Sequence, residues 1–406
     1  MSSSKKLSIS LLISLVGFPQ ISETIYTPAL PDVTRSLETS AYLTEATLAI
    51  YFLGFALGVL TWGAVSDSIG RKPTMLLGIC LYGLFTTVCG FCTSIEMLLF
   101  CRVFQAFGAS VGSVITQTIL RDAYDGTERA KLFSIITGAI AFSPAVGPLL
   151  GGFITQYVGW RMNFFTLSLL SILLFVWTYL GLRETRPEKT LKVSFSQLKA
   201  VIQSMLSSRS LWGHIFLISG TNGIVFGFYQ EAPFVFIEQL GMAPSAYGCF
   251  GLFMAGASIL ASRFSYRQSL HWSGLSLIRL GSCCILLGGF LFNFLALSGK
   301  MQAAQFNLMS VILVLFLIFF GIGLIIPSSL SSALKPYQIA GGMAGSIFGG
   351  CYYAFIATFT WLMSMLHNGT TLPLPLYVCL LGGVIAVAAY MVKPEGECTE
   401  GASIKT

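Results

Sequence analysis

Charged residues are scarce in this chain of 406 residues. Asp, Glu, Lys and Arg together make up 10% of the sequence, whereas a soluble domain carries about a quarter. Hydrophobic residues reach 55%, and the mean hydropathy is +0.79. This balance excludes a soluble globular protein and equally excludes a disordered chain. The class that remains is an integral membrane protein, with no room for a sizeable soluble domain.

The sequence also lacks the motifs of several common catalytic sites. It has no GxxxxGK[ST] pattern, which argues against an ATP-driven pump. The GxSxG match at residues 108–112 lies inside an apolar run, so we interpret it as chance. His214, His271 and His367 lack metal-ligand spacing, and Cys89 and Cys92 form a lone CxxC that is better read as structural. We therefore expect no enzyme activity, no cofactor and no metal.

Apolar runs long enough to cross a bilayer, about 18 residues or more, occur throughout the chain. The twelve runs are residues 7–27, 43–65, 74–93, 97–119, 132–156, 161–182, 211–237, 246–263, 274–297, 305–330, 339–365 and 374–392. The first follows two lysines but has no convincing cleavage site, so we interpret it as a retained span. Because each span must satisfy its own backbone hydrogen bonds in lipid, the sequence predicts an all-α membrane bundle.

The placement of basic residues predicts the orientation of these spans. If the N-terminus is cytoplasmic, 19 of the 23 Lys and Arg residues lie in inside segments. Arg35, Arg161 and Lys300 would lie outside, and Arg102 lies within a span. The positive-inside rule thus places both termini in the cytoplasm. The net charge of +7 serves this topology rather than nucleic-acid binding.

The longest loop divides the predicted spans into six and six. It covers residues 183–210 and carries six basic residues. We therefore expect a first six-helix bundle at 1–182, a basic cytoplasmic linker at 183–210, a second bundle at 211–392 and a cytoplasmic tail at 393–406. The apolar spacing of residues 195–206 is consistent with an amphipathic surface helix, although a solvated linker fits equally well. Two sets of six spans form the layout of a transporter built from repeated halves.

The loop that follows the second span reads GAVSDSIGRK. Its Gly63, Asp67, Gly70, Arg71 and Lys72 resemble the GxLxDxxGRK signature of the major facilitator superfamily. That resemblance implies twelve transmembrane helices in two pseudo-symmetric six-helix bundles. A plainer interpretation, in which Arg71 and Lys72 only anchor the topology, remains open.

The superfamily resemblance also implies partners for this turn, which would act as a cytoplasmic latch. Asp67 would face the start of the eleventh span, and Arg71 would meet Asp122 at the end of the fourth span. The two glycines allow a short reversal of the chain between helices.

The fifth span contains SPAVGPLLGGF, in which Gly147, Pro148, Gly151 and Gly152 match the antiporter motif of superfamily exporters. Small residues and prolines let a neighbouring helix approach and let the span bend. Together with YTPALP, GFALG, RVFQAFG and APFVFIE, the motif is similar to drug:proton antiporters of the bicyclomycin-resistance type. The similarity covers residues 17–165 most closely. In that family the first-span acid stands at the position of Thr24, whereas here it is Glu23.

Three charged residues lie clearly within spans: Glu23, Arg102 and Glu231. Each costs about 2.5 to 3.5 kcal/mol on insertion scales unless it is paired or hydrated, so such residues are candidates for function. We expect Glu23 and Arg102 to pair across two spans, and protonation of the carboxylate to release that pair. Glu231 occupies the approximate counterpart of Glu23 in the second half. The alternative for Glu231 is a position near the outer membrane interface. The alternative for Arg102 is a purely structural charge.

Polar residues at helical spacing extend the predicted substrate cavity. They are Gln20, Tyr26, Gln105, Asn222 and Tyr229. With the three intramembrane charges, they would line a path between the two halves.

The sequence therefore predicts a proton-coupled antiporter that exports small amphipathic compounds, a multidrug efflux protein of the bacterial inner membrane. We expect its partners to be a small-molecule substrate, protons and the lipid bilayer, and we expect it to act as a monomer without nucleic acid. An exporter of a metabolite, sugar or peptide is the near alternative. A non-transporting membrane receptor or interaction protein is the remote one.

Overall fold

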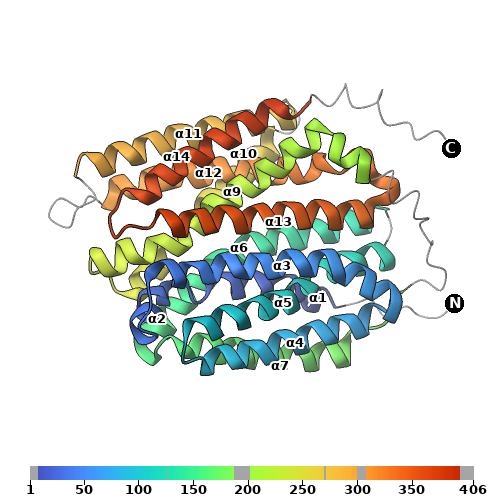
Figure 1. Ribbon diagram of the computed structural model, residues 1–406. Helices are drawn as coiled ribbons and strands as arrows, with labels where there is room; N and C mark the ends of the chain where they lie inside the picture. Colours follow the sequence, from blue (N-terminus) through green and yellow to red (C-terminus); the bar gives the residue numbers. More distant parts are fainter. Residues whose placement is uncertain (1–7, 125, 187–201, 269–270, 300–307, 394–406) are drawn as a thin grey trace. The chain divides into compact units, whose positions relative to one another are not determined.

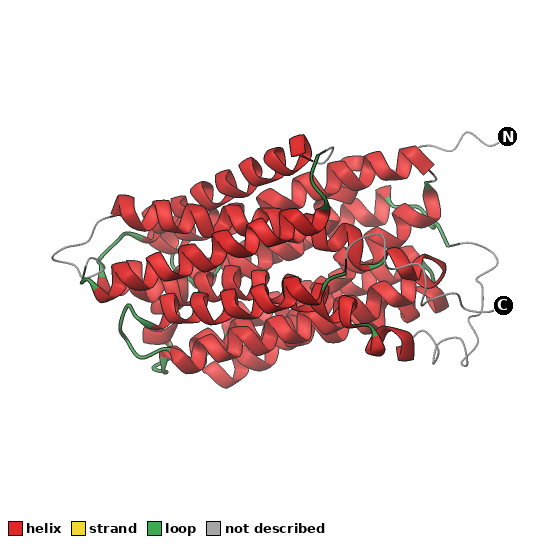
Figure 2. Ribbon diagram, turned by 90° about the horizontal axis from the view of Figure 1, so that it is seen from above, coloured by secondary structure: helices red, strands yellow, loops and turns green. Residues whose placement is uncertain are grey.

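The computed structural model describes residues 8–124, 126–186, 202–268, 271–299 and 308–393. In this part of the chain the regular structure is helical and contains no strand (Figures 1 and 2). The chain divides into two compact units, Met1–Leu191 with Ala243–Gly251, and Lys192–Met242 with Leu252–Thr406. Residues 187–201 of the predicted linker and 394–406 of the predicted tail lie outside the described residues. The predicted domain limits stay a prediction.

The N-terminal unit contains helices that correspond to the first six predicted spans. They are α1 (Ile9–Thr24), the short η1 (Thr27–Ala29) and α2 (Leu30–Ser36), α3 (Ala41–Ile69), α4 (Arg71–Phe91), α5 (Ile95–Ala123), α6 (Gly126–Val158) and α7 (Arg161–Gly181). Figure 1 shows α3, α4 and α5 running alongside one another, and contacts join α5 to both of the others. The predicted first span is therefore followed by two further short helical segments.

The C-terminal unit supplies the helices of the other six predicted spans. They are α9 (Arg209–Pro233), η2 (Phe234–Gln239), α10 (Pro244–Gln268), α11 (Gly274–Leu297), α12 (Leu308–Ala333), η4 (Lys335–Ala340), α13 (Gly341–Leu366) and α14 (Pro373–Met391). The first turns of α10 group with the N-terminal unit. Among the described residues, eleven helical segments are long and apolar enough to cross a membrane, and α6 contributes the shorter apolar segment Ala145–Val158. The all-α membrane fold is confirmed.

Serine side chains begin several of these helices. Ser40 precedes α3 and accepts a hydrogen bond from the Leu43 backbone N–H at 3.3 Å, and Ser94 does the same for Met97 at the start of α5. A serine in this position satisfies an N–H group that has no partner within the helix. Gly70, with φ of 103°, then ends α3 and allows α4 to start at the next residue. These local signals let long helices follow one another across very short connections.

Glycines set the close approach of the helices within each unit. A Cβ on Gly108 of α5 would lie 2.5 Å from the Tyr82 backbone N of α4, and one on Gly281 of α11 would lie 2.6 Å from the Gly321 carbonyl oxygen of α12. A Cβ on Gly54 of α3 would overlap the Val103 carbonyl oxygen of α5. Small residues are the usual means by which membrane helices pack backbone to backbone. The GFALG glycines thus act as helix contacts, as the sequence predicts.

Large apolar side chains are exposed along the helices of both units. On α7 they include Leu169, Ile172 and Leu173, and on α11 they include Phe290 and Phe294. A soluble protein rarely exposes so extensive an apolar surface. A bilayer solvates such side chains, so the exposed surface agrees with the membrane class that the composition predicts.

Candidate functional site

A buried polar cluster occupies the interior of the N-terminal unit. Glu23 lies in the last turn of α1 and Arg102 near the start of α5, and they are 1% and 0% exposed. Tyr51 of α3 and Tyr82 of α4 are equally buried. Four helices therefore contribute side chains to this cluster. Glu23 and Arg102, two of the three predicted intramembrane charges, are thus enclosed by protein.

Arg102 is held by an amide and by two aromatic rings. Its Nη1 donates to Gln105 Oε1 at 2.7 Å, and Gln105 Nε2 donates in turn to Thr86 Oγ1 at 2.9 Å. The guanidinium carbon lies 4.4 Å from the ring centroid of Tyr26 and 4.1 Å from that of Tyr51. A cation over aromatic faces gains electrostatic stabilisation that grows as the site loses water.

The predicted ion pair between Glu23 and Arg102 is not formed in this conformation, as judged from the described side chains. Glu23 Oε1 and the Nε and Nη2 atoms of Arg102 are buried without a hydrogen-bond partner. The prediction rested on shared depth in the membrane, which does not fix the direction of a side chain around its helix. Gln105, one turn further along α5, and the two rings hold the guanidinium instead. Arg102 is still close enough to Glu23 to act on it electrostatically.

The same cluster contains further buried polar atoms without a partner among the described residues. They are Ser22 Oγ, Tyr51 Oη and Tyr82 Oη. The Ser22 side chain interacts with both Tyr51 and Tyr82, so these three hydroxyl groups lie close together. Buried polar groups in native proteins are nearly always satisfied by protein or water. Buried donors and acceptors gathered in one place make this cluster a candidate site for water, a proton or a polar ligand group.

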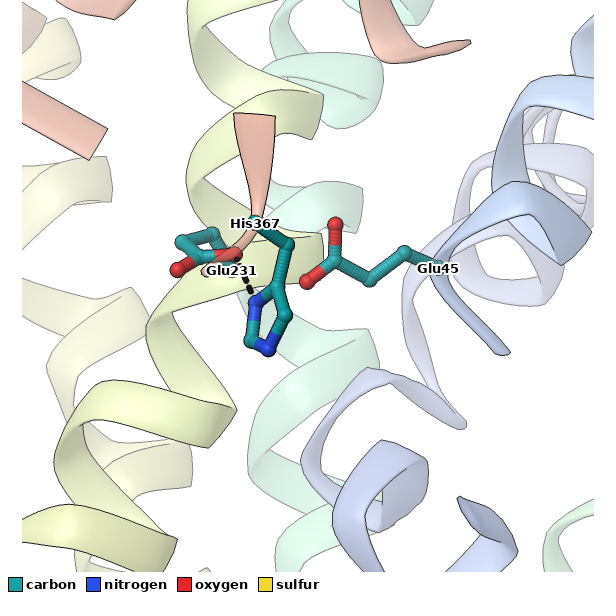
Figure 3. Close-up of side chains that lie close together, drawn as sticks. All are labelled: Glu45, Glu231 and His367. Atoms are coloured by element: carbon teal, nitrogen blue, oxygen red, sulfur yellow. Dashed lines mark hydrogen bonds and ion pairs between the residues drawn. The ribbon is translucent and has the colours of Figure 1, made fainter. Parts of the chain in front are cut away.

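A second buried acid lies in the C-terminal unit. Glu231 stands two residues before the end of α9 and is 0% exposed. Its Oε2 lies 2.8 Å from His367 Nδ1, just beyond the end of α13 (Figure 3). Glu231 Oε1 has no hydrogen-bond partner among the described residues. The His367 ring also packs edge-on against Phe234, with centroids 5.1 Å apart.

Sequence reasoning missed His367 as a partner of Glu231. The two residues are 136 positions apart, and His367 falls in a short polar segment that reads HNG. A titratable side chain at the end of a span was the available signal, but no periodicity connects residues on different helices.

The other predicted cavity residues have separate environments. The Gln20 side chain is half-buried, and its backbone carbonyl accepts the Thr24 hydroxyl at 3.2 Å. Asn222 Nδ2 donates to the Ile218 carbonyl of its own helix at 2.8 Å, and Tyr229 is buried against Phe228. Of the five, Tyr26 and Gln105 contact Arg102 directly. The cavity role of all five stays a prediction.

The turn between α3 and α4 forms a charged cluster around Arg71. Arg71 Nε donates to Asp122 Oδ2 at 2.8 Å, and Nη1 donates to Ser66 Oγ at 2.9 Å and to Asp67. The Arg71 side chain is 6% exposed, whereas that of Asp67 is 60% exposed. The structure thus brings Arg71 and Asp122 together as expected. The role of the turn as a latch, including the predicted encounter of Asp67 with the eleventh span, remains a prediction.

Glu184, which sequence reasoning did not select, completes this turn. Its carboxylate accepts hydrogen bonds from the backbone N–H groups of Arg71 at 2.9 Å and of Lys72 at 3.1 Å. These are the first two residues of α4, whose N–H groups have no partner within the helix. Partial burial disfavours the charged carboxylate, but bonds from Arg71, Arg186, Lys72 and Thr185 outweigh it, and the pKa of Glu184 is lowered. Lys72 Nζ donates to the Tyr179 carbonyl at 2.7 Å, which links the start of α4 to the end of α7.

The glycines of the antiporter motif lie against α1 beside Glu23. A Cβ on Gly147 would overlap Thr24 Oγ1, and a Cβ on Gly151 would overlap the Ile25 carbonyl oxygen. Gly152 approaches the Pro244 carbonyl oxygen in the same way, and Pro148 is buried. The motif therefore allows α6 to press against the residues that immediately follow Glu23.

Long apolar helices with ionisable side chains enclosed among them define a multi-pass membrane protein. The model of the Major Facilitator Superfamily matches residues 12–360. The chain belongs to this superfamily, whose members among the structural neighbours are transporters rather than enzymes.

Several relatives align with nearly the whole length of this chain. An uncharacterized transporter of Rickettsia bellii is 36% identical, with 95% of this chain and 96% of that one aligned. Multidrug resistance protein D of Escherichia coli is 26% identical over 93% of both chains, and the bicyclomycin resistance protein homolog of Haemophilus influenzae is 25% identical over 92% of both. The predicted resemblance to the bicyclomycin-resistance type is confirmed at this level of similarity.

A solved structure shares the fold. The crystal structure of a D-xylose-proton symporter superposes with a TM-score of 0.77 at 15% identity and covers 96% of this chain and 98% of that one.

Proposed function

We propose that this protein is a proton-coupled antiporter that exports small amphipathic compounds from the bacterial cytoplasm by alternating access. The observation that carries the proposal is the buried cluster of Glu23, Arg102 and unpartnered polar atoms. Drug-resistance proteins among the relatives, and the antiporter motif packed beside Glu23, support the same function. The bacterial inner membrane, with both termini in the cytoplasm and a monomeric chain, completes the proposal.

Glu23 is the proposed site of proton exchange. A carboxylate enclosed by protein needs a cation or a proton, because an isolated buried charge is costly. In the conformation described here, Arg102 bonds to Gln105 and leaves Glu23 without that ion pair. This arrangement suits a protonated Glu23. Release of the proton would leave a carboxylate that can draw the open Nε and Nη2 donors of Arg102 toward itself.

The exchange of partners by Arg102 provides a two-state element. In one state the guanidinium bonds to Gln105 and the acid carries a proton. In the other state the acid is charged and Arg102 neutralises it. A substrate that favours one state over the other would shift the balance and so couple its own movement to that of the proton.

Glu231 and His367 give the C-terminal unit its own proton-exchanging pair. The 2.8 Å contact joins an acid to an imidazole, the side chain that ordinarily titrates nearest to neutral pH. We propose that this pair takes part in proton transfer after Glu23. Its position at the ends of α9 and α13 suits exchange with one side of the membrane.

The function is tested by flux measurements on the purified protein. The protein is reconstituted into liposomes that contain the pH-sensitive dye pyranine, and ethidium or bicyclomycin is supplied against a proton gradient. We expect substrate to move in one direction while protons move in the other. Glu23→Gln should abolish the coupled flux, whereas Glu96→Gln, an exposed acid in the first turn of α5, should leave it unchanged.

Other outcomes separate the alternatives. Proton exchange with a sugar, peptide or metabolite but with neither drug would identify an exporter of a different substrate class. Binding of a compound without any flux would favour a receptor. Substrate export that needs no proton gradient and survives Glu23→Gln would contradict the proposal.

A further inference from the structure

Three cysteine thiols meet where α4 ends and α5 begins. Cys89 lies in the last turn of α4, Cys92 is the residue that caps its end, and Cys101 lies in the second turn of α5. All three are free thiols. Their exposed fractions are 0%, 0% and 3%, so they are enclosed by the unit rather than spread over its surface.

The register of the two helices brings these thiols together. Residues 92–94 connect α4 to α5, which therefore run antiparallel and pack against each other. Cys89 Sγ lies 4.0 Å from Gln105 Oε1. Cys101 is one turn from Gln105 on the same face of α5, and Cys92 is three residues beyond Cys89. Cys92 is thus placed opposite Cys101.

Direct side-chain interactions agree with this register. The Cys101 thiol interacts with the thiols of both Cys89 and Cys92. The sequence alone shows the CxxC pair, but Cys101 stands inside an apolar run with nothing to mark it. Only the packing of α5 on α4 reveals a third thiol beside the other two.

We propose that Cys92 and Cys101 form a redox-active pair that closes to a disulfide between the end of α4 and α5. Cys92 is favoured over Cys89 because its backbone is extended, with φ of −61° and ψ of 134°, and lies outside the helix. Cys89 is fixed within α4 and faces Gln105. A disulfide has strict geometry, and the residue in the loop can adjust its backbone to meet it.

The bond would form by a two-electron oxidation. Each thiol gives up its hydrogen, the two sulfur atoms join, and two electrons with two protons pass to an oxidant. Hydrogen peroxide is an oxidant small enough to reach enclosed thiols: its O–O bond breaks, it takes up the two electrons and two protons, and two water molecules leave. The closed bond would join Cys101, the residue directly before Arg102 in α5, to the end of α4.

Oxidation of the full-length protein tests this assignment. The protein in detergent is treated with diamide, whose N=N bond takes up the two electrons and two protons. Free thiols are then alkylated, and the linked peptides are identified by mass spectrometry without prior reduction. We expect a crosslink between Cys92 and Cys101 that dithiothreitol reverses. Cys379, whose Sγ accepts a hydrogen bond from Asn293 at 3.1 Å, serves as an internal reference that stays alkylated.

Matched variants distinguish the possible pairs. Cys92→Ser and Cys101→Ser should each lose the crosslink, whereas Cys89→Ser should keep it. Each variant is first checked for a monodisperse gel-filtration peak, and the wild-type peptide map provides the answer independently of any variant. A crosslink from Cys101 to Cys89, or full alkylation of both Cys92 and Cys101 after diamide, would overturn the proposal.

Discussion

Arg102 shows how a single buried cation is accommodated without a carboxylate bound to it. One amide oxygen and two ring faces surround the guanidinium, and two of its nitrogen atoms keep donors open. A planar cation can stack on both rings while it donates at its edge. The residue is therefore held in place yet free to take a second partner, which is what a proton-driven exchange requires.

Arg102→Lys is the sharpest test of this arrangement. Lysine keeps the charge but lacks the planar group that stacks on Tyr26 and Tyr51 while it bonds to Gln105. We expect drug-driven proton exchange in liposomes to fall about tenfold or more, which corresponds to about 1.4 kcal/mol. The control is Arg279→Lys, which changes an exposed arginine 5.9 Å from the Tyr390 ring. Equal rates for both variants would show that charge alone is sufficient.

At this scale the sequence predicts that Glu23, Arg102 and Glu231 are enclosed within the helices, but it does not predict their partners. Arg102 and Gln105 share a helix face, so their contact follows from spacing. Tyr51 and Thr86 reach the same cluster from other helices, and Glu184 reaches Arg71 across 113 positions. No pattern within one helix contains that information. The expected Glu23–Arg102 pair was wrong for this conformation for the same reason.

Among the helices, α4 depends on a residue that lies far away in the chain. The Glu184 carboxylate satisfies the first two N–H groups of α4, a role that a capping residue normally plays from the preceding turn. Gly70 stands where that cap would be, and a Cβ there would lie 2.6 Å from Glu184 Oε2. The glycine of the turn and the distant acid therefore work as one capping unit.

Glu184→Gln should lower the free energy of unfolding by about 0.5 kcal/mol, a small value for a cap because the side chain is exposed. The folded-state pKa of Glu184 is lowered, so its stabilisation is complete above the ordinary glutamate value of about 4.3 and is lost as the pH falls through the lowered pKa. Thermal unfolding from pH 7 to pH 3 measures the difference between wild type and variant. That difference should shrink at the acid end. Glu238→Gln is the exposed control, and a difference that grows toward low pH would contradict this role.

Gly151→Ala tests the contact between α6 and α1. A Cβ at Gly151 would overlap the Ile25 carbonyl oxygen, so the helices must separate. We expect a loss of about 1 to 3 kcal/mol in stability, together with slower exchange because Glu23 lies beside this contact. Gly383→Ala on α14 is the matched control, since nothing lies within 4 Å of its Cβ position. That variant should be neutral or slightly stabilising, and unfolding in denaturant compares the two.

The sequence predicts which segments form helices more accurately than it predicts the residues at which those helices end. All twelve apolar runs correspond to helices, but α3 continues to Ile69 and α12 to Ala333, beyond the predicted runs. An apolar count stops where polar residues begin, whereas a helix continues until its backbone is capped. The short η1 and α2 after the first span follow from Pro28 and Pro31, which restart the chain rather than extend α1.

For the whole molecule, the distribution of charge predicts the side of the membrane on which each end lies. Both termini are expected in the cytoplasm, because most basic residues fall in the segments on their side. A C-terminal green fluorescent protein fusion should fluoresce, and a C-terminal alkaline phosphatase fusion should be inactive. Phosphatase fused after residue 300, in a predicted outer loop, is the positive control. An active phosphatase at the C-terminus would reverse the proposed topology.

Proton exchange at Glu23 is the centre of this account, and substrate-induced proton release measures it directly. Purified protein in unbuffered detergent solution near neutral pH is mixed with ethidium or bicyclomycin, and the released protons are followed with a pH-sensitive dye. The wild type should release protons as the substrate binds, and Glu23→Gln should bind the substrate with little or no release. Equal release from both proteins, or substrate binding by the wild type without any release, would contradict the assignment of the coupled proton to Glu23.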